Sequence, residues 1–379
     1  MKRLIEPLIQ RDLLKKMVFL SGPRQAGKTT LAQTIAKQWR RPQILNWDVL
    51  TDQRIIRNQS WPADADLLVF DELHKMVDWR SWLKGVVDSR SRGQTIMVTG
   101  SARLDSFRQA GESLAGRYFA WHLYPVTVQE LVTVQGQDPD LALSLLLERG
   151  GFPEPLLTDE GRDALRWRQL YLDGLIREDI IEFSRIAEVR AMRLFVDMLR
   201  ERVGSTISLA SMARDLQVSS VTLNRYLGIL ESLHIVFLVR PYHRNIARAI
   251  LKEPKVYFFD TGLVLGDEGA RFENACAVML FTHIQLLQDS EGRVLSLNYI
   301  RDKDRREIDF AISESQQLLE LIECKWANVG TPSYLAALSN RFPQARATLL
   351  LRHLRQREQR ERVSVEPAAA WLAEPPTWR

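Results

Sequence analysis

Short hydrophobic runs alternate with helix-forming segments over the first third of the chain. The first run covers residues 17–20 and precedes a glycine-containing loop and a helical segment at 30–39. Further runs of strand length cover residues 44–47, 67–70, 95–98 and 118–123, and helical segments separate the first four strands. Strands that alternate with helices form a parallel sheet covered by helices. The pattern therefore predicts an α/β fold with a parallel sheet for residues 1–135.

The hydrophobic spacing changes in the middle of the chain. Between residues 163 and 202 apolar positions recur at helical spacing, which predicts a helical lid over 136–202. Residues 208–233 have the pattern of a helix, a turn at Gln217-Val218, a serine cap and a second helix. With residues 235–240 as a wing strand, this segment predicts a winged helix-turn-helix over 203–245.

Alternation with a period of two returns in the last third of the chain. Residues 306–312 alternate like a strand, 313–317 have the composition of a turn, and 318–326 form a second strand. We expect these two strands to pair as a hairpin within a C-terminal α/β domain over 246–379. A closing strand and short helix at 363–372 complete that domain.

Composition narrows the protein class. The 379 residues are 45% hydrophobic and 26% charged, and they contain no apolar stretch long enough to span a membrane. The two cysteines, Cys276 and Cys324, argue against a disulfide framework and favour a reducing compartment. Because the amino terminus has no apolar signal core, we expect a cytoplasmic protein. The net charge of +5 permits DNA binding without demonstrating it.

The loop after the first strand has the chemistry of a phosphate-binding site. Glycines allow close backbone approach, and the loop N–H groups and the helix N-terminus then face phosphate oxygens. Lys28 is expected to reach the β- and γ-phosphates of ATP, and the Thr29 hydroxyl to bind Mg²⁺. The expected nucleotide-binding residues are Gly22, Pro23, Arg24, Gln25, Ala26, Gly27, Lys28, Thr29 and Thr30.

Two acids follow the strand at residues 67–70 directly. The carboxyl ends of parallel strands face the ligand crevice, so Asp71 and Glu72 are expected beside the phosphates. Asp71 is predicted to hold Mg²⁺ through water, and Glu72 to polarise the attacking water. The sequence thus predicts ATP hydrolysis as well as ATP binding.

Polar residues after the next strand complete the predicted catalytic set. Thr99 is our first choice and Ser101 our second for a sensor of the γ-phosphate, although either could serve as a helix cap. Arg117 is the preferred candidate, before Arg103 and Arg108, for a guanidinium that reaches a neighbouring subunit's nucleotide. An arginine that acts in this way requires a homo-oligomer. The alternative is a surface arginine in an ion-pair network.

These segments together resemble a known family. Residues 22–30, 68–72, 98–101, 114–117 and 123–125 are similar to the archaeal-type AAA-like ATPases of bacteria and archaea. Gly150-Gly151-Phe152-Pro153-Glu154 resembles that family's link into its helical lid, and residues 255–263 resemble the segment that opens its C-terminal domain. The resemblance implies an ATPase and also a winged helix at 203–245.

Two uses of the helix-turn-helix stay open. In one, Ser220, Thr222, Asn224 and Arg225 face DNA as a recognition helix would, with Arg240, His243, Arg244 and Arg248 as phosphate contacts. In the other, the module is a structural lid that transmits the nucleotide state. A single arginine in the second helix is few for a recognition helix.

A second candidate site lies in the C-terminal domain. Glu323 and Lys325 project from the same face of a strand, and the predicted hairpin brings Asp309 beside them. Glu273, at the start of a helix, adds a third carboxylate for a divalent ion such as Mg²⁺ or Mn²⁺, with Lys325 orienting the attacking water. The set resembles the restriction-endonuclease-like (PD-(D/E)xK) superfamily, whose motif is Asp, a gap and Glu-x-Lys. The alternative is a nuclease-like scaffold with structural ion pairs and no cleavage.

Three hypotheses follow from these patterns. The first is a Mg²⁺-dependent ATPase that acts on or with DNA and whose nucleotide cycle is coupled to the nuclease-like domain. The second is a nucleotide-gated switch or assembly protein whose C-terminal domain is a non-cleaving binding module. The third, a small-molecule kinase, lacks an evident acceptor-binding lid. We favour the first, with ATP and ADP, DNA and further copies of the chain as partners.

Overall fold

The structure is a computed structural model of the 379-residue chain, and it describes all residues except 102–113, 115, 159, 182–185, 243–251 and 379. The chain forms two compact units. The first contains Met1–Tyr124 and Ser232–His234, and the second contains Pro125–Glu231 and Ile235–Arg379. The ranges that we assign to the lid, the helix-turn-helix and the C-terminal domain thus lie in the second unit, apart from residues 232–234.

The first unit is built on a five-stranded sheet with the order β2-β3-β4-β1-β5. All neighbouring strands are parallel. The strands are β1 (Met17–Ser21), β2 (Pro42–Asn46), β3 (Leu67–Asp71), β4 (Thr95–Thr99) and β5 (Tyr118–His122). This arrangement confirms the α/β parallel sheet predicted from the alternation of hydrophobic runs and helices.

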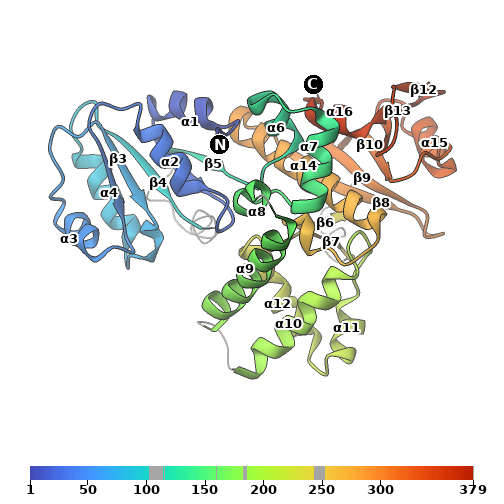
Figure 1. Ribbon diagram of the computed structural model, residues 1–379, viewed down its shortest axis with the longest axis horizontal. Helices are drawn as coiled ribbons and strands as arrows, with labels where there is room; N and C mark the ends of the chain where they lie inside the picture. Colours follow the sequence, from blue (N-terminus) through green and yellow to red (C-terminus); the bar gives the residue numbers. More distant parts are fainter. Residues whose placement is uncertain (102–113, 115, 159, 182–185, 243–251, 379) are drawn as a thin grey trace. The chain divides into compact units, whose positions relative to one another are not determined.

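Helices cover both faces of this sheet (Figure 1). Phe19, Phe70 and Val98 share one hydrophobic cluster with residues of α3 (Leu50–Asn58) and α4 (Trp79–Ser89). The intervening strand residues point to the opposite face, where α1 (Glu6–Leu13) and α2 (Lys28–Ala36) pack. Because the central strands are buried on both faces, they are continuously hydrophobic rather than alternating.

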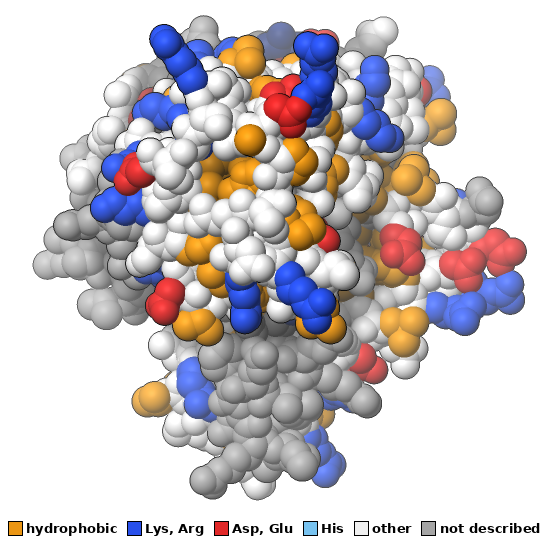
Figure 2. Space-filling model, turned by 90° about the vertical axis from the view of Figure 1, so that its left-hand side faces the viewer, with side chains coloured by type: hydrophobic (Ala, Val, Ile, Leu, Met, Phe, Trp, Pro, Cys, Tyr) orange, Lys and Arg blue, Asp and Glu red, His pale blue; other side chains and the backbone are white. Residues whose placement is uncertain are grey.

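The first unit also exposes hydrophobic side chains. Ile44, Val49, Leu50 and Val77 are exposed. Figure 2 shows the left-hand side of Figure 1, where hydrophobic side chains gather near the middle and Lys and Arg side chains surround them. Gathered hydrophobic surface of this kind is typical of surfaces that contact other proteins.

The second unit begins with a helical part. Its helices are α6 (Val128–Gln135), α7 (Pro139–Arg149), α8 (Pro153–Leu157), α9 (Gly161–Ile181) and α10 (Ile186–Arg200). The last two lie within or beside the helical segment that we predict at 163–202, and residues 182–185 are outside the described residues. A buried ion pair of 3.0 Å between Arg168 of α9 and Asp260 connects this part to the 3-10 helix η3 (Thr261–Leu263). None of the helices in the described ranges is long and apolar enough to span a membrane.

A mixed eight-stranded sheet forms the rest of the second unit, with the order β12-β13-β11-β10-β9-β8-β6-β7. The strands are β6 (Val236–Pro241), β7 (Lys255–Phe258), β8 (Leu295–Arg301), β9 (Glu307–Glu314), β10 (Gln317–Lys325), β11 (Arg346–Leu351), β12 (Glu358–Arg360) and β13 (Val363–Pro367). The helices of this part are α14 (Glu268–Glu291), α15 (Ser333–Arg341) and α16 (Ala368–Ala373).

The antiparallel pair β9–β10 is the hairpin predicted from the sequence. Ser315 and Gln316 make its turn with positive φ angles of 48° and 70°. The pairing places Ile322 opposite Phe310, and this register brings the polar residues of the two strands together. The predicted closing strand and short helix correspond to β13 and α16.

The helix-turn-helix pattern corresponds to α11 (Leu209–Asp215) and α12 (Ser220–Ser232). Gln217 makes the turn with a φ of 55°, and the Ser219 hydroxyl accepts the N–H of Thr222 at 3.0 Å as the cap of α12. The strand predicted as the wing is β6, which pairs with β7 and β8 in the eight-stranded sheet. The winged helix at 203–245 stays a prediction, because residues 243–251 lie outside the described residues.

Candidate functional site

The carboxyl edge of the five-stranded sheet gathers polar side chains. The register of the parallel strands places Asn46, at the end of β2, beside Asp71 of β3. Asp71 in turn lies beside Thr99 of β4. The loop predicted to bind phosphate follows β1 at the same edge. Parallel pairing therefore brings together side chains that are 25 or more residues apart in sequence.

Two glycines fix the shape of the phosphate loop. Gly22 has a φ of 139°, and a Cβ at this position would lie 2.2 Å from the carbonyl oxygen of Leu123. Gly27 precedes α2 with a φ of 93°, in the left-handed region that favours glycine. Both glycines allow the main chain to turn tightly into the N-terminus of α2, and the backbone N–H groups of a helix N-terminus are able to bind phosphate oxygens. The glycine conformations of the loop thus agree with the phosphate-binding loop expected from the sequence.

Lysine and arginine side chains hold the loop through its carbonyl groups. The Lys28 ammonium donates to the carbonyl oxygens of Gly22 at 3.0 Å and Pro23 at 2.6 Å. Buried Arg3 donates to the carbonyl oxygens of Ala26 at 3.0 Å and Tyr124 at 2.6 Å. Arg3 therefore connects the loop to the segment that follows β5.

Asp71 is the centre of the polar edge. Its Oδ2 accepts hydrogen bonds from the Thr29 hydroxyl at 2.8 Å and from the Asn46 amide at 3.0 Å. Its Oδ1 accepts one from the Thr99 hydroxyl. These three partners are neutral, so none of them cancels the carboxylate charge. A carboxylate beside a hydroxyl is the oxygen donor set that Mg²⁺ prefers, and Thr29 and Asp71 fit such an ion.

Glu72, unlike Asp71, has a cationic partner among the described residues. It follows β3 with a φ of 55°, and its N–H donates to the carbonyl oxygen of Thr99 at 2.9 Å. Its carboxylate lies 3.3 Å from the Lys75 ammonium, which also contacts Asp48 at 2.5 Å. Burial disfavours the charged lysine, but the hydrogen bond to Asp48 and the negative charge of Glu72 raise the pKa of Lys75. Glu72 therefore has a cationic partner from which it must separate to act as a base.

The remaining predicted residues of this site lie at different places. Thr99 points at Asp71, whereas Ser101 lies 3.3 Å from His74 Nε2. Arg117 lies at the amino end of β5, where the next residue pairs with Met17, and it contacts Asp88 at 2.9 Å. It is thus at the opposite edge of the sheet from the loop of its own chain. Arg103 and Arg108 lie outside the described residues.

Sequence reasoning missed three residues of this site. Asn46 ends a predicted strand, so its position at the ligand edge was a signal that could have identified it. Lys75 follows Glu72 by three residues, a spacing that permits pairing. Arg3 carries no local signal, because its partners are 23 and 121 residues away.

The C-terminal candidate residues also come together, in the second unit. The Lys325 ammonium lies 2.6 Å from Glu323 and 3.8 Å from Asp309. Asp309 Oδ2 accepts the N–H of Cys324 at 2.9 Å, and Glu323 Oε2 accepts the N–H of Asp309 at 3.3 Å. The hairpin therefore positions the Asp and Glu-x-Lys residues as predicted from the alternation of the two strands.

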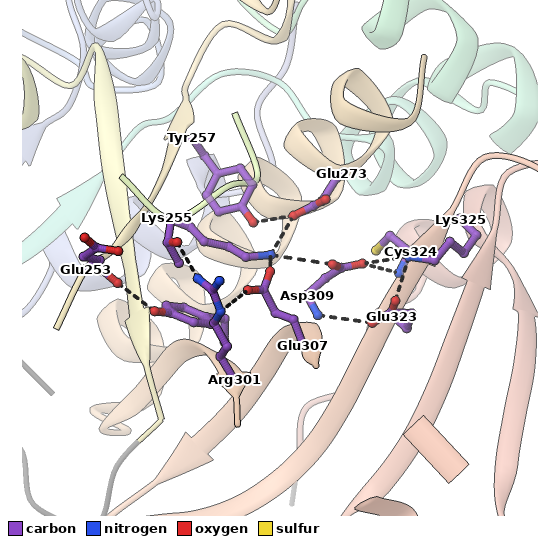
Figure 3. Close-up of polar contacts among 12 residues, drawn as sticks. Glu253, Lys255, Tyr257, Glu273, Arg301, Glu307, Asp309, Glu323, Cys324 and Lys325 are labelled. Atoms are coloured by element: carbon purple, nitrogen blue, oxygen red, sulfur yellow. Dashed lines mark hydrogen bonds and ion pairs between the residues drawn. The ribbon is translucent and has the colours of Figure 1, made fainter. Parts of the chain in front are cut away.

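The fourth predicted residue, Glu273, brings an unpredicted lysine into this cluster. Lys255 of β7 is fully buried, and its ammonium lies 3.1 Å from Glu273, 2.7 Å from Glu307 and 3.6 Å from Asp309. The Tyr257 hydroxyl donates to Glu273 at 2.6 Å. Figure 3 shows the Lys255 side chain extending from its strand to the space between these carboxylates.

The charges of this cluster depend on one another. Burial and then the charge of Asp309 raise the pKa of Glu273 to about 7, against the opposing attraction of Lys255. Burial and Asp309 likewise raise the pKa of Glu323 to about 7, against Lys325. Burial disfavours the charged form of Lys255, but the surrounding carboxylates outweigh burial and raise its pKa. Burial likewise disfavours the charged form of Lys325, but Asp309 and Glu323 outweigh it and raise its pKa, so both lysines carry their charge at neutral pH.

The arrangement does not fit the divalent ion that the resemblance implies. The carboxylates of Glu273 and Asp309 both face the Lys255 ammonium instead of a free space between them. Within the described ranges, no group of three or more His, Cys, Asp or Glu side chains is placed to hold a metal. The residues predicted as ligands are thus close together, but a lysine occupies the position between them.

Models of three protein families match successive segments of the chain. Residues 14–132 match the model of a family described as an AAA domain. Residues 141–266 and 268–371 match two families described as domains of unknown function, DUF8612 and DUF4143. The AAA match covers all five strands of the first sheet and the loop at Lys28.

Individual proteins are also similar to parts of this chain. An uncharacterized protein of Mycobacterium tuberculosis is 29% identical over 253 residues, which are 65% of this chain and 55% of that protein. The chain thus spans about half the length of this curated relative. A Walker-type ATPase of Pyrococcus abyssi is similar in structure, with a TM-score of 0.42, 13% identity and coverage of 68% of this chain and 93% of that chain.

RuvB of Thermotoga maritima, described as a Holliday junction branch migration motor, is also similar. It has a TM-score of 0.34 and 19% identity, with coverage of 62% of this chain and 89% of that chain. The family match and the five-stranded parallel sheet agree with the loop geometry at Gly22 and Gly27. Residues 14–132 therefore match an AAA domain, and their parallel sheet and glycine loop fit the α/β fold of P-loop ATPases.

Proposed function

We propose that the protein is a Mg²⁺-dependent ATPase whose active site is the carboxyl edge of the five-stranded sheet. The observation that carries this proposal is the placement of Asp71 between the hydroxyls of Thr29 and Thr99, directly beside the phosphate loop. Neutral partners leave the charge of Asp71 available to a cation. The glycine geometry of the loop leaves backbone N–H groups available to phosphate oxygens.

Each residue of this edge has a definite task in hydrolysis. Lys28 exchanges the carbonyl oxygens of Gly22 and Pro23 for phosphate oxygens, a change between hydrogen-bond acceptors that needs no rearrangement of the main chain. Thr29 and Asp71 hold Mg²⁺, which neutralises phosphate charge when it is bound. Glu72 accepts the proton of the attacking water after its carboxylate leaves Lys75.

The test is ATP hydrolysis by the purified chain and two variants. Lys28→Ala removes the phosphate contact, and Glu72→Gln removes the base, so each lowers kcat by about 100-fold or more. Glu72→Gln keeps ATP binding, whereas Lys28→Ala weakens it in calorimetry. Lys37→Ala, an exposed lysine after the same helix, is the matched control and leaves both unchanged. Hydrolysis that persists in Glu72→Gln would contradict the role of that residue.

Arg117 supports a second part of the proposal, assembly into a homo-oligomer. Its position at the far edge of the sheet, held by Asp88, suits contact with the nucleotide of a neighbouring copy rather than its own. Arg117→Ala and Lys28→Ala are each expected to be inactive alone. An equimolar mixture regains activity, because intact Arg117 of one copy meets the intact loop of another. Arg90→Ala, which removes an exposed arginine nearby, is the control.

We propose DNA as a partner of the second unit through α12. Ser220, Asn224 and Arg225 are exposed on this helix, whereas Leu223 and Tyr226 are buried against the module. The exposed side chains are those that the helix-turn-helix pattern assigns to DNA. Fluorescence anisotropy with duplex DNA tests this partner. Asn224→Ala combined with Arg225→Ala weakens binding at least tenfold, and equal binding by the variant would exclude α12 as the contact.

A further inference from the structure

The carboxylate cluster of the second unit already contains a cation. Lys255 extends from β7 and its ammonium lies 2.7 Å from Glu307, 3.1 Å from Glu273 and 3.6 Å from Asp309 (Figure 3). It is fully buried, so water does not share in its solvation. An ammonium in such a place requires carboxylate partners, because burying an unpaired charge is very costly. The carboxylates therefore compensate the buried positive charge of Lys255.

The partners of Lys255 have little freedom to turn toward another ion. Glu273 also accepts a hydrogen bond from the Tyr257 hydroxyl at 2.6 Å. Its carboxylate packs against Gly204 so closely that a Cβ added to Gly204 would lie 2.9 Å from both carboxylate oxygens. Asp309 is held on its other oxygen by the N–H of Cys324 at 2.9 Å. Main-chain and side-chain contacts thus hold both carboxylates beside the ammonium.

A divalent ion at this place would meet both a geometric and an electrostatic obstacle. Mg²⁺ requires oxygen ligands at about 2.0–2.1 Å in nearly octahedral geometry. The oxygens of Glu273 and Asp309 surround an ammonium nitrogen at longer distances. A metal beside Lys255 would also be repelled by its positive charge in a setting of low dielectric constant.

We propose that Lys255 is the resident cation of this site, that it excludes divalent metal from the carboxylates of Glu273 and Asp309, and that the C-terminal domain is consequently a non-cleaving module. Lys325 does not fill this role. It lies at the outer side of the cluster, pairs with Glu323 at 2.6 Å and is 39% exposed. The two lysines therefore differ in function although both contact Asp309.

The first experiment uses the full chain without nucleotide. Binding of Mn²⁺ is measured by electron paramagnetic resonance for the wild type and for Asp309→Asn. Equal binding by the two proteins is expected, because the carboxylates of the wild type are occupied by Lys255. A Mn²⁺ ion bound by the wild type and lost in Asp309→Asn would overturn the proposal. This readout depends on neither ATP binding nor hydrolysis, so it stands apart from the proposed ATPase function.

The second experiment removes the resident cation. Lys255→Met keeps the length of the side chain and leaves the carboxylates without their ammonium. This variant is expected to gain one bound Mn²⁺ per chain and a Tm that rises with Mn²⁺, and both gains disappear in Lys255→Met combined with Asp309→Asn. Lys325→Met is the matched control, and it gains no ion because Lys255 is still present. A gain in Lys325→Met that equals that in Lys255→Met would overturn the special role of Lys255.

Cleavage provides the third readout. Supercoiled plasmid incubated with the wild type and Mg²⁺ or Mn²⁺ stays intact under the proposal. Nicking by the wild type that disappears in Asp309→Asn would overturn it. If Lys255→Met does not fold, the comparison of the wild type with Asp309→Asn in metal binding and nicking still decides the question.

Discussion

The two polar centres of this protein use the same residue types in opposite ways. At the carboxyl edge of the five-stranded sheet, which we call the nucleotide edge, Lys28 contacts main-chain carbonyl oxygens, and Asp71 contacts neutral hydroxyl and amide groups. In the C-terminal cluster, Lys255 contacts three carboxylates directly. A lysine on carbonyl oxygens can exchange them for phosphate, whereas a buried lysine among carboxylates is a permanent part of the fold. The partner of each lysine, rather than its presence, distinguishes a binding site from a structural one.

Replacement of the buried lysine has the largest expected effect on stability. Lys255→Met leaves the carboxylates of Glu273 and Glu307 buried without their cation, which costs about 3–5 kcal/mol of unfolding free energy. Lys325→Met, at the partly exposed lysine, costs less because solvent screens that pair. Urea unfolding of both variants measures the difference. An equal loss in the two would remove the distinction between the inner and the outer lysine.

Replacement of the central aspartate tests the nucleotide edge. Asp71→Asn keeps the hydrogen bonds of the edge largely in place but removes the charge that a cation requires, so kcat for ATP falls by about 100- to 1,000-fold. The corresponding change at the other centre, Asp309→Asn, leaves ATP hydrolysis unchanged. Steady-state kinetics at saturating Mg²⁺ measure both. Full activity in Asp71→Asn would show that the cation binds elsewhere.

The carboxylate cluster also predicts a pH dependence of stability. The pKa of Glu273 and that of Glu323 are raised from 4.5 to about 7, so the folded protein binds more protons than the unfolded chain between these values. Stability therefore falls as pH rises from about 4.5 to about 7, by an amount on the order of 3 kcal/mol for each of the two carboxyls, and levels off above that range. Urea midpoints across pH 4.5–8 for the wild type and for Glu273→Gln combined with Glu323→Gln provide the test. A variant with the same slope as the wild type would exclude these carboxyls as its cause.

The arginine behind the phosphate loop has a smaller expected effect. Arg3→Met removes the buried donors to the carbonyl oxygens of Ala26 and Tyr124, which costs about 1–3 kcal/mol. The loosened loop also raises the KM for ATP severalfold. Thermal unfolding and steady-state kinetics measure these changes. Lys2→Met, the exposed neighbour, is the control and changes neither.

The smallest effect is expected at Lys75, the partner of the proposed base Glu72. Lys75→Met frees the carboxylate of Glu72 from a pair at 3.3 Å that is partly exposed, so stability changes by about 1 kcal/mol or less. Because Glu72 no longer has to leave a cation, kcat rises up to a few fold. A fall in kcat would mean that Lys75 orients the base rather than restrains it. Lys84→Met, on α4, serves as the control.

Much of the first unit could be predicted from its sequence because its signals are local. Each strand is a continuous hydrophobic run, and the residue that follows β3 lies at the ligand edge in any parallel sheet. The hairpin that unites Asp309 with Glu323 was also predictable, since only a short turn separates its strands. The helix-turn-helix followed from spacing and from the cap at Ser219.

The features that sequence could not reveal depend on contacts between distant segments. Lys255 precedes Asp309 by more than 50 residues, and two strands, β8 and β6, lie between β9 and its own strand in the sheet. No local sequence pattern predicts that the ammonium of Lys255 lies between these carboxylates. Glu307 did carry a signal, because it is two residues from Asp309 on the same strand and so shares its face. The pairing of β6 with β8 carried no local signal either, because β8 lies more than 50 residues further along the chain.

The position of Lys255 in the chain determines where the protein can be divided into fragments. The lysine belongs to the segment matched at 141–266, whereas Glu273, Glu307 and Asp309 belong to the segment matched at 268–371. A fragment that begins at residue 268, between the two matches, would contain the three acidic residues without the lysine that compensates their charge. Boundaries drawn from family matches therefore divide a single electrostatic unit, and a truncation that respects it has to begin ahead of β7.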